Sequence, residues 1–71
     1  MTYGSGGRET IQRIRRLVKS GVIPPVFTPA LVNQALGIHW AGTFLPKHRV
    51  GNPGGYTELF VQTGRGVYRL L

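Results

Sequence analysis

The spacing of the apolar residues changes along this chain from the period of a helix to the alternation of a β-strand. Between Arg8 and Lys19 the apolar side chains recur so that they fall on one face of a helix. The end of the chain instead holds two short runs rich in β-branched and aromatic residues, separated by a glycine-containing connection. Such a chain is expected to form an α+β domain in which three helices come first and a β-hairpin follows.

The first helix is expected over Arg8–Lys19. Its apolar positions, spaced three, three and one apart, are Ile11, Ile14, Leu17 and Val18. Gly21 suits a C-terminal cap, and Pro24-Pro25 prevents the helix from continuing. Residues 1–7 are rich in glycine and serine and have no periodic pattern, so they are expected to form a flexible tail before a single domain over residues 8–71.

A second helix is marked at both ends. Thr28 followed by Pro29 is typical of a helix start, because threonine caps free N–H groups and proline is tolerated at the first helical position. Gly37 is expected to end this helix. The preceding Val26–Phe27 favours a short edge strand, since the prolines before it cannot donate to a sheet.

A third, shorter helix is expected over about residues 43–49. Thr43 is its predicted N-cap, and Pro46 then lies in the first turn, where proline is tolerated. The following Gly51–Gly55 segment is predicted to be a loop.

A β-hairpin is expected to close the chain over about residues 58–71. Its two strands lie on either side of Thr63–Gly66, a connection that contains two glycines. The alternation of side chains along a strand predicts an inward-facing set of Leu59, Val61, Tyr68 and Leu70. Arg69 is then expected to point outwards.

The chain is strongly basic. Nine lysine and arginine residues face only two acids, Glu9 and Glu58, for a formal net charge of +7. A small basic domain typically meets a polyanion, because its cations release the counterions condensed on phosphates. Solubility alone is the simpler explanation, since net charges of this size are ordinary in small domains.

The length and the missing cysteines limit the class of protein. Seventy-one residues allow one domain with a modest core, and a chain without cysteine has no disulfide and fits a reducing compartment. The chain shows neither the apolar run of a signal peptide nor the roughly 20 apolar residues that span a bilayer. A cytoplasmic protein without a membrane partner is therefore expected.

Catalysis is not expected. General acid–base chemistry needs titratable groups held together, and this chain offers two separated acids, two separated histidines and no cysteine. His39 and His48 have no further ligand at metal-binding spacing, so no metal site is predicted. Gly51–Gly55 lacks the ending of a phosphate-binding loop, and neither a cofactor nor a small-molecule substrate is expected.

The order of the expected elements resembles the winged helix-turn-helix domains. The start of the second helix, Phe27-Thr28-Pro29-Ala30-Leu31-Val32, looks like the entry to the second helix of that family. The segment Val61-Gln62-Thr63-Gly64-Arg65-Gly66-Val67-Tyr68-Arg69-Leu70 looks like the close of bacterial modules, including some found beside restriction and nuclease proteins. The resemblance implies binding of double-stranded DNA at the nucleoid, in a transcription-regulator-like or nuclease-associated targeting module with a covalent or non-covalent partner domain.

The resemblance also implies which residues meet DNA, because the family places its third helix in the major groove and its hairpin wing on the backbone or minor groove. The corresponding residues here are Thr43, Lys47, His48, Arg49, Arg65 and Arg69. Lysine and arginine neutralise phosphates, and arginine also binds guanine through two hydrogen bonds. The third helix departs from the family pattern because it is short, contains Pro46 and has few base-reading side chains. This departure argues against sequence-specific readout more than against DNA binding.

Three alternatives remain open. A winged-helix domain can instead dock a protein partner. RNA binding would use Trp40 or Tyr56 to stack on unpaired bases. The first helix is either a solvated basic face or a second contact to phosphates, through Arg8, Arg13, Arg15, Arg16 and Lys19.

Overall fold

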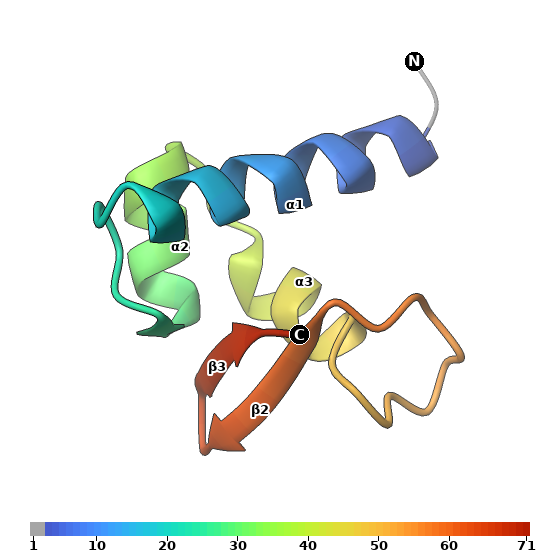
Figure 1. The fold of residues 1–71 in the computed structure, drawn as a ribbon. Coiled ribbons are helices and arrows are strands. Elements are labelled where there is room, and N and C mark those ends of the chain that lie inside the picture. The colour runs from blue at the N-terminus through green and yellow to red at the C-terminus, as the bar shows by residue number, and fades with distance from the viewer. Residues whose placement is uncertain (1–2) are drawn as a thin grey trace.

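Three helices and a three-stranded antiparallel sheet make up the fold, so the expected α+β class is confirmed (Figure 1). The structure, a computed structural model, describes residues 3–71, with side chains from Arg8 onwards. In chain order the elements are α1 (Tyr3–Lys19), β1 (Val26–Phe27), α2 (Pro29–Leu36), α3 (Ala41–Lys47), β2 (Phe60–Gly64) and β3 (Val67–Leu70).

β3 is the central strand of the sheet, with β1 on one side and β2 on the other. Both pairings are antiparallel, and Phe27 lies opposite Tyr68 while Phe60 lies opposite Leu70. Directly opposed residues point to the same face of a sheet, so these four side chains share one face. Through β1, the segment between α1 and α2 is tied to the C-terminal hairpin.

One hydrophobic core lies between the helices and this face of the sheet. Its buried residues are Ile11, Ile14, Ile23, Phe27, Val32, Ala41, Phe44, Leu45, Phe60 and Tyr68. The ring of Phe60 packs edge-on against Phe27, with 6.2 Å between ring centroids, and against Phe44, with 5.9 Å. Aromatic pairs favour this arrangement. Phe60 therefore joins β2 to both β1 and α3.

α1 has the predicted amphipathic pattern, but it begins before Arg8. Its backbone is helical from Tyr3, so the helix includes residues that the composition assigned to a flexible tail. Glycine costs a helix about 1 kcal/mol relative to alanine and carries no apolar period, which is why the composition does not reveal this part of the helix. Residues 1–2 of the predicted tail lie outside the described residues, as do the side chains of residues 3–7.

α2 begins and ends as predicted. The Thr28 hydroxyl oxygen accepts a hydrogen bond from the Leu31 N–H at 3.3 Å, and Pro29 is the first helical residue. Gly37 follows the last turn in the left-handed conformation, with φ at 68°. The short edge strand predicted at Val26–Phe27 is confirmed as β1.

α3 begins at Ala41 and not at the predicted cap, Thr43. Trp40 occupies the N-cap position and forms no side-chain cap. Instead, Asn33 Oδ1 in α2 accepts a hydrogen bond from the Ala41 N–H at 2.9 Å. Because this cap comes from the preceding helix, the residues around Trp40 contain no local signal that marks the start of α3.

The end of α3 also differs from the prediction. Pro46, expected in the first turn, is the sixth of the seven residues of the helix, and the helix stops at Lys47. A proline beyond the first turn removes a backbone hydrogen bond and weakens the turn that contains it. His48 is the C-cap, and Arg49 lies outside the helix in an isolated β-bridge with Phe60.

The hairpin is confirmed, but the inward face of β2 is shifted by one residue from the prediction. Phe60 is fully buried at 0% exposure, whereas Val61 is half-buried on the other face, opposite Arg69. Leu59 and Phe60 both contact the core at the start of the strand, so alternation counted from Leu59 gives the wrong face for Val61. Tyr68 lies on the core side as predicted.

Replacing Asn33 with alanine is expected to lower the free energy of unfolding by about 1 kcal/mol, because the part-buried Ala41 N–H loses its cap. Urea unfolding measures this loss. Gln34→Ala, at the exposed neighbouring position of α2, is the control and is expected to change stability by less than about 0.5 kcal/mol. Equal losses in the two variants would contradict the role of Asn33 as the cap of α3.

Candidate nucleic-acid interface

The nine cationic side chains divide between two parts of the chain. Five of them lie on α1. The other four follow from the end of α3 to β3, and they are Lys47, Arg49, Arg65 and Arg69. The second group contains the four lysine and arginine residues that the resemblance assigned to DNA contact, so its arrangement decides what the predicted site can do.

An open groove of about 750 Å³ lies between α3 and the loop that follows it, and we call it the α3 groove. Three predicted site residues line it, and they are Thr43, Lys47 and Arg49. Thr43 and Lys47 lie four residues apart, so they share one face of the helix. The loop contributes the opposite wall through Asn52, Gly54 and Tyr56.

Lys47 lies against the ring of Tyr56 in this groove. Its Nζ atom is 4.5 Å from the centre of the ring, within the range of a cation–π contact. Tyr56 is 48% exposed, so the contact lies at the surface, where an anion can also reach the ammonium group. A lysine that is already held loses less side-chain entropy when it binds an anion. Tyr56 therefore positions Lys47.

Asn52 holds the loop in shape. Its Nδ2 atom donates to the carbonyl oxygens of Arg49 and Tyr56, both at 2.9 Å, and its Oδ1 accepts from the Tyr56 N–H at 2.8 Å. The Gly51 N–H donates to Glu58 Oε2 at 2.8 Å. The wall of the groove is therefore fixed by side chain–backbone hydrogen bonds, which is typical of asparagine in turns.

Gly54 is required by the close approach of Tyr56. A Cβ atom at this position would overlap the aromatic ring, with Tyr56 Cδ2 only 2.8 Å away. Any larger residue at Gly54 therefore has to displace the ring that positions Lys47.

Gly54→Ala is expected to lower the affinity for duplex DNA by about threefold, which corresponds to the loss of a surface cation–π contact. Fluorescence anisotropy with a labelled duplex measures the change. Tyr56→Leu removes the same contact, so the double variant is expected to bind no more weakly than Tyr56→Leu alone. Additive losses in the double variant would show that Gly54 does not act through Tyr56.

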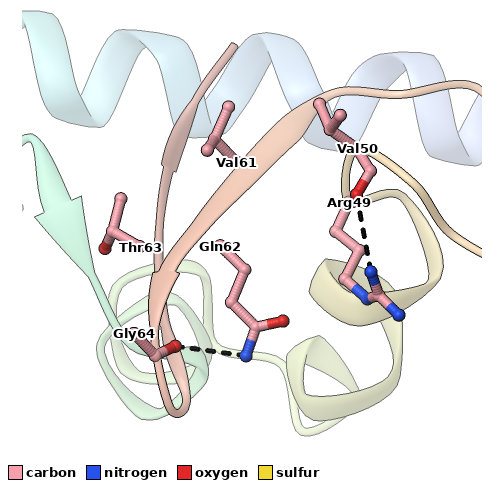
Figure 2. A pocket seen from close by; sticks show the side chains of 6 residues that line it. All are labelled: Arg49, Val50, Val61, Gln62, Thr63 and Gly64. Carbon is pink, nitrogen blue, oxygen red and sulfur yellow. Dashed lines mark hydrogen bonds between the residues drawn. The ribbon is translucent and has the colours of Figure 1, made fainter.

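A second open groove, of about 450 Å³, runs beside β2, and we call it the hairpin groove (Figure 2). Arg49 lines both grooves, and Gln62 lies across the hairpin groove from it. The Arg49 guanidinium donates to the carbonyl oxygens of Val50 and Gly51 at 3.4 and 3.5 Å, which are long hydrogen bonds. Arg49 therefore lies between α3 and the hairpin with donors that a stronger acceptor can recruit.

Arg65 lies at the tip of the hairpin, as predicted. The strands are joined by Arg65 and Gly66, between the paired Gly64 and Val67. Gly66 has a φ of 70°, a backbone conformation that residues with a side chain rarely adopt, so glycine is favoured in this tight turn. Arg65 is exposed and lines neither groove.

Besides Arg65, two more predicted site residues, His48 and Arg69, lie outside both grooves. His48 Nδ1 donates to the Thr57 carbonyl oxygen at 2.8 Å, and its ring centroid lies 4.8 Å from that of buried Phe44. His48 therefore ties the end of α3 to the loop. Arg69 is exposed on the face of the sheet away from the core, where it lies opposite Val26 and Val61.

Several residues that line the two grooves were not predicted as DNA contacts, among them Asn52, Tyr56 and Gln62. Asn52 carries a local signal, because asparagine before proline in a glycine-rich loop favours a turn stabilised by its side chain. The sequence suggested Tyr56 only as an RNA-stacking residue, since nothing local places it beside Lys47. The position of Gln62 depends on which residues of β2 face the core, and these differ from the predicted Leu59 and Val61.

The described part of the chain contains neither a membrane-spanning helix nor a cluster of metal ligands. Within residues 3–71, no helix has the length and apolar character needed to cross a membrane. Within the same residues, no three acidic or histidine side chains lie close enough together to hold a metal ion.

Comparison with known proteins gives no relative that bears on the function. No protein-family model matches the chain, and no curated protein or solved structure is significantly similar to it. The function is therefore argued from the geometry and charge of the two grooves.

Proposed function

We propose that this chain is a winged helix-turn-helix domain that binds double-stranded DNA through α3 and the β2–β3 hairpin. The observation that carries the proposal is the convergence of Thr43, Lys47 and Arg49 on the α3 groove. Arg49 extends this cationic surface to the hairpin groove, and Arg65 lies at the tip of the hairpin beyond it.

The order of the elements supports the assignment of the fold. A short strand, β1, separates α1 from α2, and the hairpin follows α3. Asn33 of α2 caps the first residue of α3, so the two helices and the turn between them act as one unit. The proposed reading helix and the proposed wing are also joined, because Phe60 packs against Phe44.

Binding is expected to rest on phosphate contacts. Lys47 and Arg49 neutralise phosphates of a backbone that follows the α3 groove, and Arg65 reaches a second part of the same duplex. Thr43 adds an uncharged hydroxyl that donates to a phosphate oxygen.

Sequence-specific readout is not part of the proposal. α3 has seven residues and is about 10 Å long, so it presents two turns to a groove. Arginine side chains recognise guanine well in other proteins. Here, however, Arg49 lies beyond the end of α3 and lines both the α3 groove and the hairpin groove. The domain is therefore expected to bind duplexes of different sequence with similar affinity.

A binding role and not a catalytic one fits the inventory of side chains. The two acids of the chain lie far apart in sequence. Glu9 is on α1, and the carboxylate of Glu58 accepts a hydrogen bond from the Gly51 N–H. Neither forms the pair of titratable groups that acid–base catalysis needs. The proposed role is a DNA-targeting module of a regulator or a nuclease, located with the nucleoid, in which any cutting belongs to a partner domain.

Exposed apolar side chains at strand ends and beside the sheet favour a protein-docking module as the second candidate. Val26 and Leu71 are 46% and 67% exposed, and Val50 is 43% exposed. Exposed apolar side chains of this size are able to contact another protein. RNA binding is less favoured, because the ring of Tyr56 already contacts Lys47 and Gly54.

The salt dependence of binding tests the proposal. Three phosphate contacts, from Lys47, Arg49 and Arg65, predict that affinity for a short duplex falls about 40-fold between about 50 and 200 mM salt. Fluorescence anisotropy at several salt concentrations measures the slope. An affinity that is independent of salt, or no binding at the lowest concentration, would contradict the proposal and favour the protein-docking candidate.

A further inference from the structure

The exposed face of α1 holds more than half of the basic residues of the chain. All five are exposed to solvent, and they are Arg8, Arg13, Arg15, Arg16 and Lys19. Among the described residues none of them takes part in an ion pair. Glu9 is the only acid on the helix, so this face presents an almost purely positive surface.

Only part of the charge of this face stabilises the helix. Arg16 and Lys19 lie in the last turn, where a positive charge interacts favourably with the helix dipole and stabilises the helix. Arg15 and Lys19 lie four residues apart, and Arg13 and Arg16 lie three apart, which are spacings at which like charges destabilise a helix. Mixed charges would give the same solubility without this repulsion. A partner of opposite charge explains the pattern better than solvation does.

The cationic face of α1 points away from the α3 groove and the hairpin. α1 packs on the core through Ile11 and Ile14. At 3.6 residues per turn, Arg16 and Lys19 lie on the opposite side of the helix from these residues. Figure 1 shows α1 along one side of the molecule and the hairpin along the other, with α3 between them and nearer the hairpin.

One duplex does not reach both surfaces. The molecule measures 32 × 30 × 20 Å, and a duplex much shorter than the DNA persistence length of about 150 base pairs does not bend around an object of this size. The cations of α1 are therefore left without a phosphate partner when a short duplex occupies α3 and the hairpin.

We propose that α1 binds a second DNA duplex, so that a single copy of the domain bridges two duplexes. The five cations extend over about 16 Å of helix, a length over which a duplex carries about ten phosphates, counted on both strands. This inference rests on the proposed function, because the first duplex is the one bound by α3 and the hairpin.

The α1 contact is the weaker of the two. In the part of the chain that the structure describes, its long side chains form no hydrogen bond or ion pair that holds them, so ordering each one on a phosphate has an entropic cost. Lys47 in the α3 groove is already held against Tyr56. Bridging is therefore expected at low salt and lost first as salt is raised.

The test compares two variants that each lose three positive charges. The α1 variant carries R15Q, R16Q and K19Q. The α3 variant carries K47Q, R49Q and R65Q. Each protein is loaded on a biotinylated duplex attached to beads, a fluorescent duplex is added, and the fluorescence retained per bound protein is measured. The substituted side chains of α1 are all exposed, so this variant is expected to remain folded.

The wild-type protein is expected to retain the fluorescent duplex at low salt. The α1 variant is expected to bind the immobilised duplex within about threefold of wild type but to retain about tenfold less of the fluorescent one. If the α1 variant retains as much of the fluorescent duplex as wild type does, the bridging proposal is overturned. This is the result expected if two associated copies of the protein each bind one duplex through α3 and the hairpin. The proposal is also overturned if the wild-type protein captures no second duplex, the result expected if α1 meets an acidic protein.

The α3 variant separates the two proposals. It is expected to lose most of its binding to the immobilised duplex. If it binds that duplex as tightly as wild type does, the proposed function itself fails, whatever the α1 variant shows.

Discussion

Replacing Arg49 with glutamine is expected to lower the affinity of the α3–hairpin face for duplex DNA by about 10- to 100-fold, the loss of a strong charge-assisted contact. Arg49 is the cationic side chain that lines both grooves. Its hydrogen bonds to the Val50 and Gly51 carbonyl oxygens are long, at 3.4 and 3.5 Å, so a phosphate replaces them at little cost. Glutamine keeps much of the side chain but removes the charge.

The affinity in this experiment is best read from the backbone amide shift of Gly66 during titration with a short duplex, because that signal reports the hairpin and not α1. Arg69→Gln is the matched control. It removes the same charge from an exposed side chain outside both grooves, and it is expected to change the affinity by less than about threefold. Equal losses in the two variants would mean that net charge, and not the position of Arg49, determines binding.

Replacing Phe60 with alanine is expected to lower the free energy of unfolding by about 3–5 kcal/mol, the usual cost of removing a buried aromatic ring. Phe60 is fully buried and packs against both Phe27 and Phe44. A domain of this length has about 4–10 kcal/mol of stability in total, so the variant is expected to lose about a third or more of it. Circular dichroism during urea unfolding measures the change.

The neighbouring residue on β2 provides the control for this prediction. Val61 is half-buried on the outer face of the sheet, and Val61→Ala is expected to lower stability by less than about 1 kcal/mol. A larger loss from Val61→Ala than from Phe60→Ala would show that Val61, and not Phe60, faces the core, as alternation from Leu59 predicts.

Local signals were sufficient for two of the helices. The spacing of Ile11 and Ile14 places both in the core, and their burial in α1 confirms the amphipathic prediction. Thr28 and Gly37 mark the ends of α2, because caps act through hydrogen bonds to residues three or four positions away. Features of this kind can be predicted from sequence, since the interacting groups are close along the chain.

The features that differ from the prediction depend on contacts between distant residues. The start of α3 is set by Asn33, which belongs to another helix. The inward position of Phe60 is set by its packing against Phe27 and Phe44. Neither contact leaves a periodic pattern in the local sequence, so helix and strand rules misplace the start of α3 by two residues and the inward face of β2 by one.

The candidate site was predicted in part for the same reason. Thr43 and Lys47 could be paired in advance, because four residues separate them on a helix. The contribution of Tyr56 could not, since it depends on Asn52 holding the loop and on Gly54 leaving room for the ring. The sequence identified the basic residues of the interface but not the loop that positions one of them.

The central claim is that α3, the loop after it and the hairpin tip form one surface for a duplex. Its most direct test is a map of backbone amide shifts on adding a short duplex at low salt. The largest shifts are expected over residues 42–49, 52–56 and 64–66, with smaller ones on α1. A map in which these three segments do not shift, while the outer face of the sheet does or nothing does, would contradict the claim.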